Sequence, residues 1–143
     1  MTITETMLTV RYAETDQMGI VHHAVYPVWF EAARTDYLRQ AGMSYAVLEK
    51  QGLLLPLASL QCRYLSPAHY EDEVVIRTAI TRMTHVKIFF RYQALRAADG
   101  ALLAEGETVH ACTDRTLRPA HFARRFPEIY RAVRSFAGLA EGQ

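Results

Sequence analysis

Asp16 is the side chain in this sequence that is best placed to do chemistry. It lies in a short polar loop that leads directly into a long, largely apolar helix expected to end at Gly42. The first N–H groups of a helix lack partners within the helix, so they can hold a developing negative charge. A carboxylate beside such donors can attack a carbonyl carbon or draw a proton from water. We therefore treat Asp16 as a candidate catalytic residue, the simpler interpretation being an Asx-turn or a helix cap.

The helix after this loop has the periodicity of a buried face. Its apolar residues recur at spacings of three and four, which places them on one side of a helix. They are Val25, Trp29, Ala32, Ala33, Tyr37 and Ala41. Pro27 is tolerated in a first turn, and Gly42 can end the helix because it adopts the left-handed conformation at little cost. One long apolar helix needs a sheet to cover it, so we expect strands to wrap around it.

Alternating and β-branched segments predict strands in most of the remaining chain. The expected strands cover Leu8 to Ala13, Leu53 to Leu65, Glu73 to Met83, Val86 to Ala97 and Leu102 to Thr113. Asp99-Gly100 is a hairpin signal between the last two strands. A short helical turn is expected at 43–52 and an amphipathic helix at about 127–137. Several strands after one helix indicate an α+β fold with an antiparallel sheet, in a single domain (1–143) whose core spans about 8–114.

The composition argues against several classes of protein. The chain carries 16 basic and 15 acidic side chains, whereas a nucleic-acid-binding surface needs a strong basic excess. No stretch approaches the ~18 apolar residues that span a membrane, and no secretory signal is visible, so we expect a cytoplasmic protein. Cys62 and Cys112 lack CxxC spacing and are expected to be reduced. The adjacent His22 and His23 lack the spacing of metal ligands, so we expect no metal site.

Two motifs resemble those of a known enzyme family. The first is Tyr12-Ala-Glu-Thr-Asp16-Gln-Met-Gly19-Ile-Val-His-His23-Ala-Val-Tyr26, followed by Phe30-Glu31-Ala-Ala-Arg34. The second is Tyr64-Leu-Ser-Pro67-Ala68, followed by Asp72-Glu73-Val74. With these motifs the chain resembles the hotdog-fold acyl-CoA thioesterases, within them the 4-hydroxybenzoyl-CoA thioesterase-like group, and there the bacterial branch linked to the Tol–Pal system. The likeness covers about residues 8–114, and the tail beyond Arg118 adds nothing to it.

The resemblance implies a fold, an assembly and a reaction. The fold is a five-stranded antiparallel sheet wrapped around a long central helix, and such chains form dimers and often tetramers. The reaction is the hydrolysis of an acyl-CoA to a free carboxylic acid and CoA. No metal or redox cofactor is expected, because CoA arrives as part of the substrate. We therefore expect a homodimer or homotetramer that binds acyl-CoA and has no nucleic-acid partner.

The same resemblance assigns roles to residues of this chain. Asp16 would be the nucleophile or general base, and the N–H of His23 would polarise the thioester carbonyl. The side chains of Tyr12 and His23 would also lie near the reacting group. Residues expected to contact the substrate at matching positions of the motif are Gly19, Val21 and Tyr26. The CoA phosphates would meet basic side chains of the partner subunit around the turn between the third and fourth strands, for which the candidates are His85, Lys87 and Arg91.

Two other functions are open at this point. A hotdog hydratase or dehydratase would use a D-x-N-P-x-H loop, or a histidine with a distant acid, whereas Gln17-Met18-Gly19 follows Asp16 here. A non-catalytic acyl-CoA-binding domain would bind its ligand without turnover, and Asp16 would then be dispensable. The fold alone does not separate these functions, so the residues of the site must decide.

Overall fold

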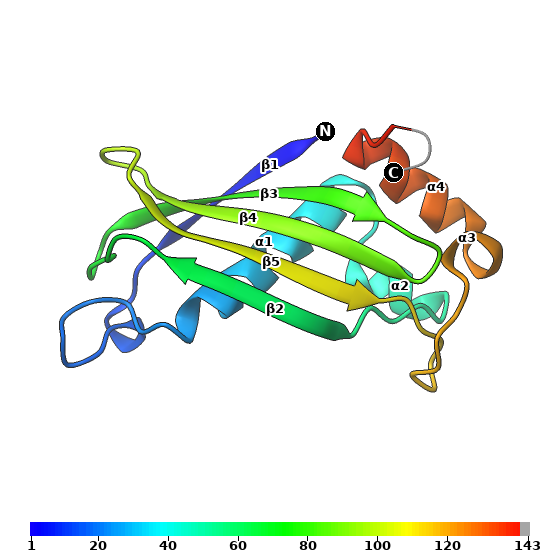
Figure 1. The fold of residues 1–143 in the computed structure, drawn as a ribbon, viewed down its shortest axis with the longest axis horizontal. Coiled ribbons are helices and arrows are strands. Elements are labelled where there is room, and N and C mark those ends of the chain that lie inside the picture. Colours follow the sequence, from blue (N-terminus) through cyan, green and yellow to red (C-terminus); the bar gives the residue numbers. More distant parts are fainter. Residues whose placement is uncertain (141–143) are drawn as a thin grey trace.

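A five-stranded antiparallel sheet covers helix α1 in the computed structural model, which describes residues 1–140 (Figure 1). The strands in chain order are β1 (Ile3–Thr9), β2 (Leu57–Tyr64), β3 (Glu73–Met83), β4 (Lys87–Arg96) and β5 (Leu102–Ala111). The helices are α1 (Val25–Gln40), α2 (Tyr45–Lys50), α3 (Phe122–Arg125) and α4 (Pro127–Ala137), and η1 (Tyr12–Glu14) is a single 3-10 turn. The strands lie in the order β1-β3-β4-β5-β2. The α+β hotdog fold expected from the resemblance is confirmed.

Helix α1 is buried over a wider arc than its spacing of three and four predicts. Its buried residues are Tyr26, Trp29, Phe30, Ala33, Tyr37 and Leu38. Ala32, which the periodicity places on the buried face, is exposed. The arc is wide because more than one element covers the helix: the Phe30 ring stacks on Tyr92 of β4 at 4.5 Å, and the Tyr37 ring meets Phe136 of α4 edge-on at 5.1 Å.

The first strand ends earlier than the alternation of Leu8, Val10 and Tyr12 predicts. β1 covers Ile3–Thr9, so the prediction that Tyr12 lies on this strand is wrong. The chain leaves the sheet because the Arg11 N–H donates to the Glu14 side chain at 2.8 Å, and the Glu14 N–H donates to the Arg11 carbonyl at 3.0 Å. These two bonds close the turn η1 and leave the Tyr12 side chain 73% exposed.

Strand β2 is one of the two edges of the sheet, and its outer side has no strand beside it within residues 1–140. It begins at Leu57, later than the predicted Leu53. Seven of its eight residues are exposed, among them the apolar Leu60 and Tyr64. An exposed, apolar edge strand presents unpaired backbone groups to which a further strand can add.

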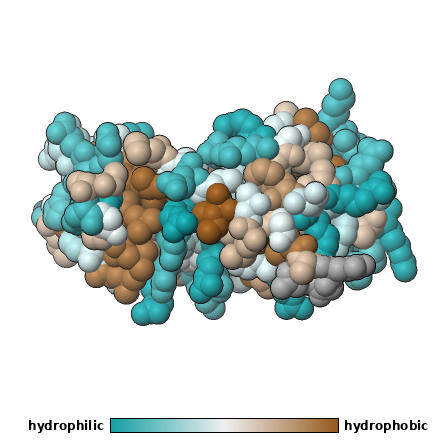
Figure 2. Space-filling view, turned by 90° about the horizontal axis from the view of Figure 1, so that it is seen from above, coloured by the Kyte–Doolittle hydropathy of each residue, from teal (hydrophilic) through white to brown (hydrophobic). Residues whose placement is uncertain are grey.

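Helix α4 closes one side of the core. It spans Pro127–Ala137 as predicted, and its apolar face turns Ile129, Val133 and Ala137 inward. Seen from above, the surface shows apolar patches that polar residues separate (Figure 2). No helix within residues 1–140 is both long and apolar enough to cross a membrane.

Candidate active site

A cavity of about 360 Å³ lies between the Asp16 loop, the start of α1 and the end of β2. The residues that line it are Asp16, Met18, Ile20, Val21, His23, Tyr26, Tyr64, Leu65, Ser66 and Pro67. Asp16, Val21, His23 and Tyr26, all selected from the sequence, therefore line the same cavity. Apart from Asp16 and a few polar tips, the lining is apolar or aromatic, which suits a ligand with an apolar group.

The Asp16 carboxylate is fixed by its own loop. Its Oδ1 accepts a hydrogen bond from the Met18 N–H at 2.8 Å, and its backbone carbonyl accepts one from the Gly19 N–H at 2.9 Å. Gly19 has φ +78°, a conformation that glycine adopts most readily. The Asx-turn uses only Oδ1 of Asp16, and no donor within residues 1–140 binds Oδ2. The turn therefore does not exclude a catalytic role for this carboxylate.

The turn before α1 leaves one backbone donor unpaired. The His22 N–H donates to the Glu14 carbonyl at 2.9 Å, and the Val25 N–H donates to the His22 carbonyl at 3.0 Å. The Ala24 N–H donates to Nδ1 of the His22 ring at 3.1 Å. By contrast, the His23 N–H finds no acceptor among residues 1–140. A free N–H at the start of a helix is the kind of group that stabilises a developing oxyanion.

Glu14 anchors the loop that carries Asp16. Its Oε2 accepts a hydrogen bond of 2.9 Å from the indole N–H of Trp29, and the residue is only 7% exposed. Burial acts to raise the pKa of Glu14, but the hydrogen bonds from the Arg11 backbone and Trp29 and the nearby Arg11 guanidinium outweigh it and lower this pKa below its usual value. Glu14 is thus a buried, ionised link between the loop and helix α1.

Tyr64 and Tyr26 form the aromatic part of the wall. The Tyr64 hydroxyl donates to the carbonyl of His23 at 2.9 Å, and its ring meets the Tyr26 ring edge-on at 5.4 Å. Burial, with a smaller contribution from Cys62, raises the pKa of each tyrosine to about 12. Both hydroxyls are therefore protonated and able to donate at neutral pH.

Tyr12 lies outside this wall. Its ring packs on Tyr70, with 5.6 Å between the centroids, and its side chain is exposed. The structure therefore does not bring Tyr12 together with Asp16 and His23 in the cavity. Its predicted contribution to the reaction stays a prediction.

The predicted phosphate-binding residues lie elsewhere in the subunit. His85, in the β3–β4 turn, stacks on His121 with 4.3 Å between the ring centroids. Desolvation, the charge of His85 and that of Arg124 lower the pKa of His121. Lys87 is exposed at the start of β4. Neither His85 nor Lys87 lines the cavity beside Asp16.

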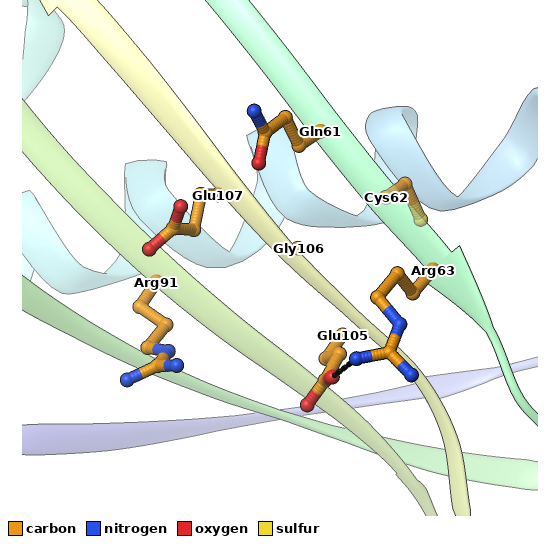
Figure 3. A pocket seen from close by; sticks show the side chains of 7 residues that line it. All are labelled: Gln61, Cys62, Arg63, Arg91, Glu105, Gly106 and Glu107. Atoms are coloured by element: carbon orange, nitrogen blue, oxygen red, sulfur yellow. Dashed lines mark hydrogen bonds and ion pairs between the residues drawn. The ribbon is translucent and has the colours of Figure 1, made fainter.

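Arg91 lies on the face of the sheet that is turned away from α1, in a second hollow of about 200 Å³ (Figure 3). Across this face Arg63 pairs with Glu105 at 3.2 Å, and Arg91 stands opposite Glu107 in the β4–β5 register. The next residue of β4, Tyr92, points into the core. Within one subunit the sheet therefore separates Arg91 from the core side, and the role of the three basic residues toward CoA stays a prediction.

A family model described as the thioesterase-like superfamily matches residues 10–135. The chain belongs to this superfamily. The putative acyl-CoA thioesterase YneP of Bacillus subtilis is 36% identical to it over 133 residues, which are 92% of this chain and 96% of the relative. The acyl-CoA thioester hydrolase YbgC of Escherichia coli is 33% identical over 105 residues, 73% of this chain and 78% of the relative. The DHNA-CoA thioesterase of Staphylococcus aureus has a structure that matches with a TM-score of 0.89 at 33% identity, covering 96% of this chain and 92% of that one.

Membership of the thioesterase-like superfamily confirms the resemblance and corrects its extent. The tail beyond Arg118 was expected to add nothing, yet the match continues to residue 135, well into α4. The extent was underestimated because a short amphipathic helix carries no distinctive motif. The link to the Tol–Pal system stays a prediction.

Sequence reasoning missed two residues of the site. Tyr64 was read only as part of a strand and of the second motif, because nothing local shows that its hydroxyl reaches back to His23. Glu14 stands two residues before Asp16 and looks like an ordinary loop carboxylate until its bond to Trp29 is seen. The signal available for Tyr64 was its place in the motif Tyr64-Leu-Ser-Pro67, all four residues of which line the cavity.

Proposed function

We propose that this chain hydrolyses the thioester bond of an acyl-CoA, releasing a free carboxylic acid and CoA. One observation carries the proposal: Asp16 and His23 line the same cavity, and each retains an unpaired group, Oδ2 and the backbone N–H, within residues 1–140. Membership of the thioesterase-like superfamily and the names of the relatives YneP and YbgC support it.

The chemistry needs only these two groups and water. The His23 N–H donates a hydrogen bond to the thioester oxygen as negative charge develops there, and one such donor is worth about a hundredfold or more in rate. Asp16 either attacks the carbonyl carbon, expelling the CoA thiolate and leaving an anhydride that water then cleaves, or removes a proton from the attacking water. Both routes end with the same acid and CoA. Neither uses a metal or a redox cofactor, and CoA is part of the substrate.

The cavity lining favours an apolar acyl group. Tyr26 and Tyr64 offer aromatic faces and edges, and Met18, Ile20 and Leu65 offer aliphatic surface. The S. aureus relative is named for an aromatic acyl-CoA, DHNA-CoA. A planar aromatic acyl group would meet the tyrosine edges, whereas an alkyl chain would follow the aliphatic wall, so the substrate panel below includes both.

The active assembly is a homodimer in which two β2 strands pair. The exposed apolar edge of β2, which ends at the cavity residue Tyr64, supports this arrangement. In such a dimer the basic residues His85, Lys87 and Arg91 of one subunit would be available to the CoA phosphates bound by the other. Sedimentation equilibrium of the purified protein tests it, and a mass of one chain would contradict it. The tetramer, the cytoplasmic location and the Tol–Pal link stay predictions.

The decisive experiment is thiol release from short, long and aromatic acyl-CoAs by the wild type and by Asp16→Asn. Asparagine retains an oxygen that can accept from the Met18 N–H, so the loop keeps its hydrogen bond, but it is neither a base nor a nucleophile. We expect the variant to lose at least about a hundredfold in kcat on the best substrate. Leu117→Ala, an exposed apolar residue outside the cavity lining, serves as the matched control and should keep wild-type turnover.

Each result of this experiment has a clear meaning. Turnover by the wild type and its loss in Asp16→Asn would establish the hydrolase and place its chemistry at Asp16. Equal turnover by both proteins would keep the enzyme and move its chemistry elsewhere. Binding of acyl-CoA by the wild type without any thiol release would reject catalysis in favour of a binding domain.

A further inference from the structure

Tyr64 makes a contact that the proposed reaction does not itself require. Its hydroxyl crosses from the end of β2 to the turn before α1 and donates to the carbonyl of His23 at 2.9 Å. The two residues are 41 positions apart in the chain. The residue that carries the candidate oxyanion donor is therefore tied to the sheet by one side-chain hydrogen bond to its carbonyl.

The other bonds of this turn are local or come from the Asp16 loop. His22 is bound through its N–H by Glu14 and through its carbonyl by the Val25 N–H, and its ring accepts from the Ala24 N–H. None of these bonds involves the carbonyl of His23. The peptide between His23 and Ala24 is therefore held at its carbonyl by Tyr64 and at its N–H by the His22 ring. The His23 N–H belongs to the preceding peptide and is joined to this one through the Cα of His23.

The Tyr64 residue is 50% exposed, but its ring contacts two aromatic neighbours. It meets the ring of Tyr26 edge-on at 5.4 Å, and Tyr26 is itself only 3% exposed and in edge contact with Trp29 at 4.9 Å. The His23 ring also meets Tyr64 edge-on at 6.5 Å. These contacts restrict the orientation of the Tyr64 ring, so its hydroxyl is already directed at the His23 carbonyl before substrate binds.

We propose that Tyr64 is a positioning residue that, by holding the His23 carbonyl, restrains the backbone of His23 and with it the N–H that would face the reacting carbonyl. The inference rests on the proposed function, and Tyr64 acts through the His23 peptide without a bond to the substrate. Misplacing a catalytic group by about 1 Å can cost on the order of a hundredfold in rate. Loss of the Tyr64 hydroxyl therefore lowers kcat and leaves substrate binding largely intact.

The test uses Tyr64→Phe, which removes one oxygen and keeps the ring between its neighbours. Tyr130→Phe is the matched control: it removes the same atom from a tyrosine in α4 whose hydroxyl makes no hydrogen bond within residues 1–140. Because Tyr64 lies on the edge strand, all proteins are compared at a concentration at which they sediment with the same mass. We expect kcat of Tyr64→Phe to fall about tenfold to a hundredfold with KM changed less than about twofold, and Tyr130→Phe to match the wild type.

A second readout does not depend on activity. In protein labelled with 15N-histidine, the six histidines give six backbone amide signals. We expect the His23 amide signal to shift in Tyr64→Phe but not in Tyr130→Phe. Unchanged kcat in an active enzyme, or an unchanged His23 signal, would overturn the inference. If the wild type releases no thiol at all, the proposed function fails, and the amide signal still decides whether Tyr64 fixes this peptide.

Discussion

The indole N–H of Trp29 donates a 2.9 Å hydrogen bond to Oε2 of Glu14, two residues before Asp16. The other carboxylate oxygen of Glu14 accepts from the Arg11 N–H, and the Glu14 carbonyl accepts from the His22 N–H. One residue thus fastens the Asp16 loop to the body of α1 and to the turn at its start. The loop that carries Asp16, the candidate catalytic carboxylate, is thus held by a second carboxylate that does not line the cavity.

Replacing Glu14 by Gln should destabilise the protein at neutral pH. Gln retains an oxygen for Trp29 but loses the charge that strengthens the bonds from Trp29 and Arg11, at a cost of about 1–3 kcal/mol. The folded state holds the pKa of Glu14 below its usual 4.5, so this stabilisation is present above pH 4.5 and is lost as the pH falls further.

Urea unfolding of the wild type and Glu14→Gln at several pH values measures this difference. The difference between the two free energies of unfolding should be largest at pH 7 and should decrease below pH 4.5. A gap that does not change with pH would mean that the charge of Glu14 does not contribute.

His110 should make the protein lose stability in mildly acidic solution. Its ring is 2% exposed and lies between the Thr108 hydroxyl at 2.9 Å and the Leu55 carbonyl at 3.1 Å. Burial, together with the charge of Arg34, lowers the pKa of His110 from 6.5 to about 4. Between these two values the unfolded chain binds a proton that the folded chain does not, so the stability falls as the pH drops from 6.5 to 4.

The effect of one such proton is about 1.4 kcal/mol per pH unit, so lowering the pH from 6.5 to 5 should cost about 2 kcal/mol at this position. His110→Gln lacks the titrating group and should show a correspondingly flatter dependence between pH 7 and pH 5. Unfolding free energies at fixed protein concentration check this, and parallel curves for the two proteins would contradict it.

Gly106 should tolerate no side chain. A Cβ built there would stand 2.5 Å from Cε2 of Phe30 and 2.9 Å from the carbonyl oxygen of Gln61. Phe30 is fully buried and stacked on Tyr92, so it has little room to move. Gly106→Ala should therefore cost about 1–3 kcal/mol of unfolding free energy.

A double-mutant comparison isolates the clash. In a Phe30→Leu background the cost of Gly106→Ala should be smaller, because the ring that the new methyl group meets is absent. Glu107→Ala, at the next and exposed position of β5, should cost little. Equal costs in both backgrounds would assign the effect to the backbone instead of to Phe30.

The elements of this fold that have strong local signals could be predicted from the sequence. Helix α4 begins and ends at the predicted residues because Pro127 opens it and its apolar residues follow one period. Gly42 has φ +81° just after α1, and Gly100 has φ +70° between β4 and β5, as the turn signals imply. The five-stranded sheet wrapped around a helix was implied by the resemblance to one family, which is now confirmed, whereas local patterns only suggested it.

The parts that could not be predicted depend on contacts between distant segments. The alternation around Tyr12 is compatible with a strand, and only the bonds between Glu14 and Arg11 turn the chain away. The buried arc of α1 includes Phe30 and Leu38 because it is covered from several directions. In the site, Asp16 and His23 could be selected because they belong to one motif. Tyr64 could not, because it contacts His23 from β2, 41 positions along the chain.

The position of Tyr64 has a consequence for how this protein should be assayed. Tyr64 is the last residue of β2, so the same strand supplies the open edge of the sheet and a wall of the cavity. A strand that adds to this edge would restrain the residue that holds His23. The specific activity would then depend on protein concentration. It would rise as the β2 edges become paired and level off when pairing is complete, so an assay of dilute protein would underestimate the specific activity.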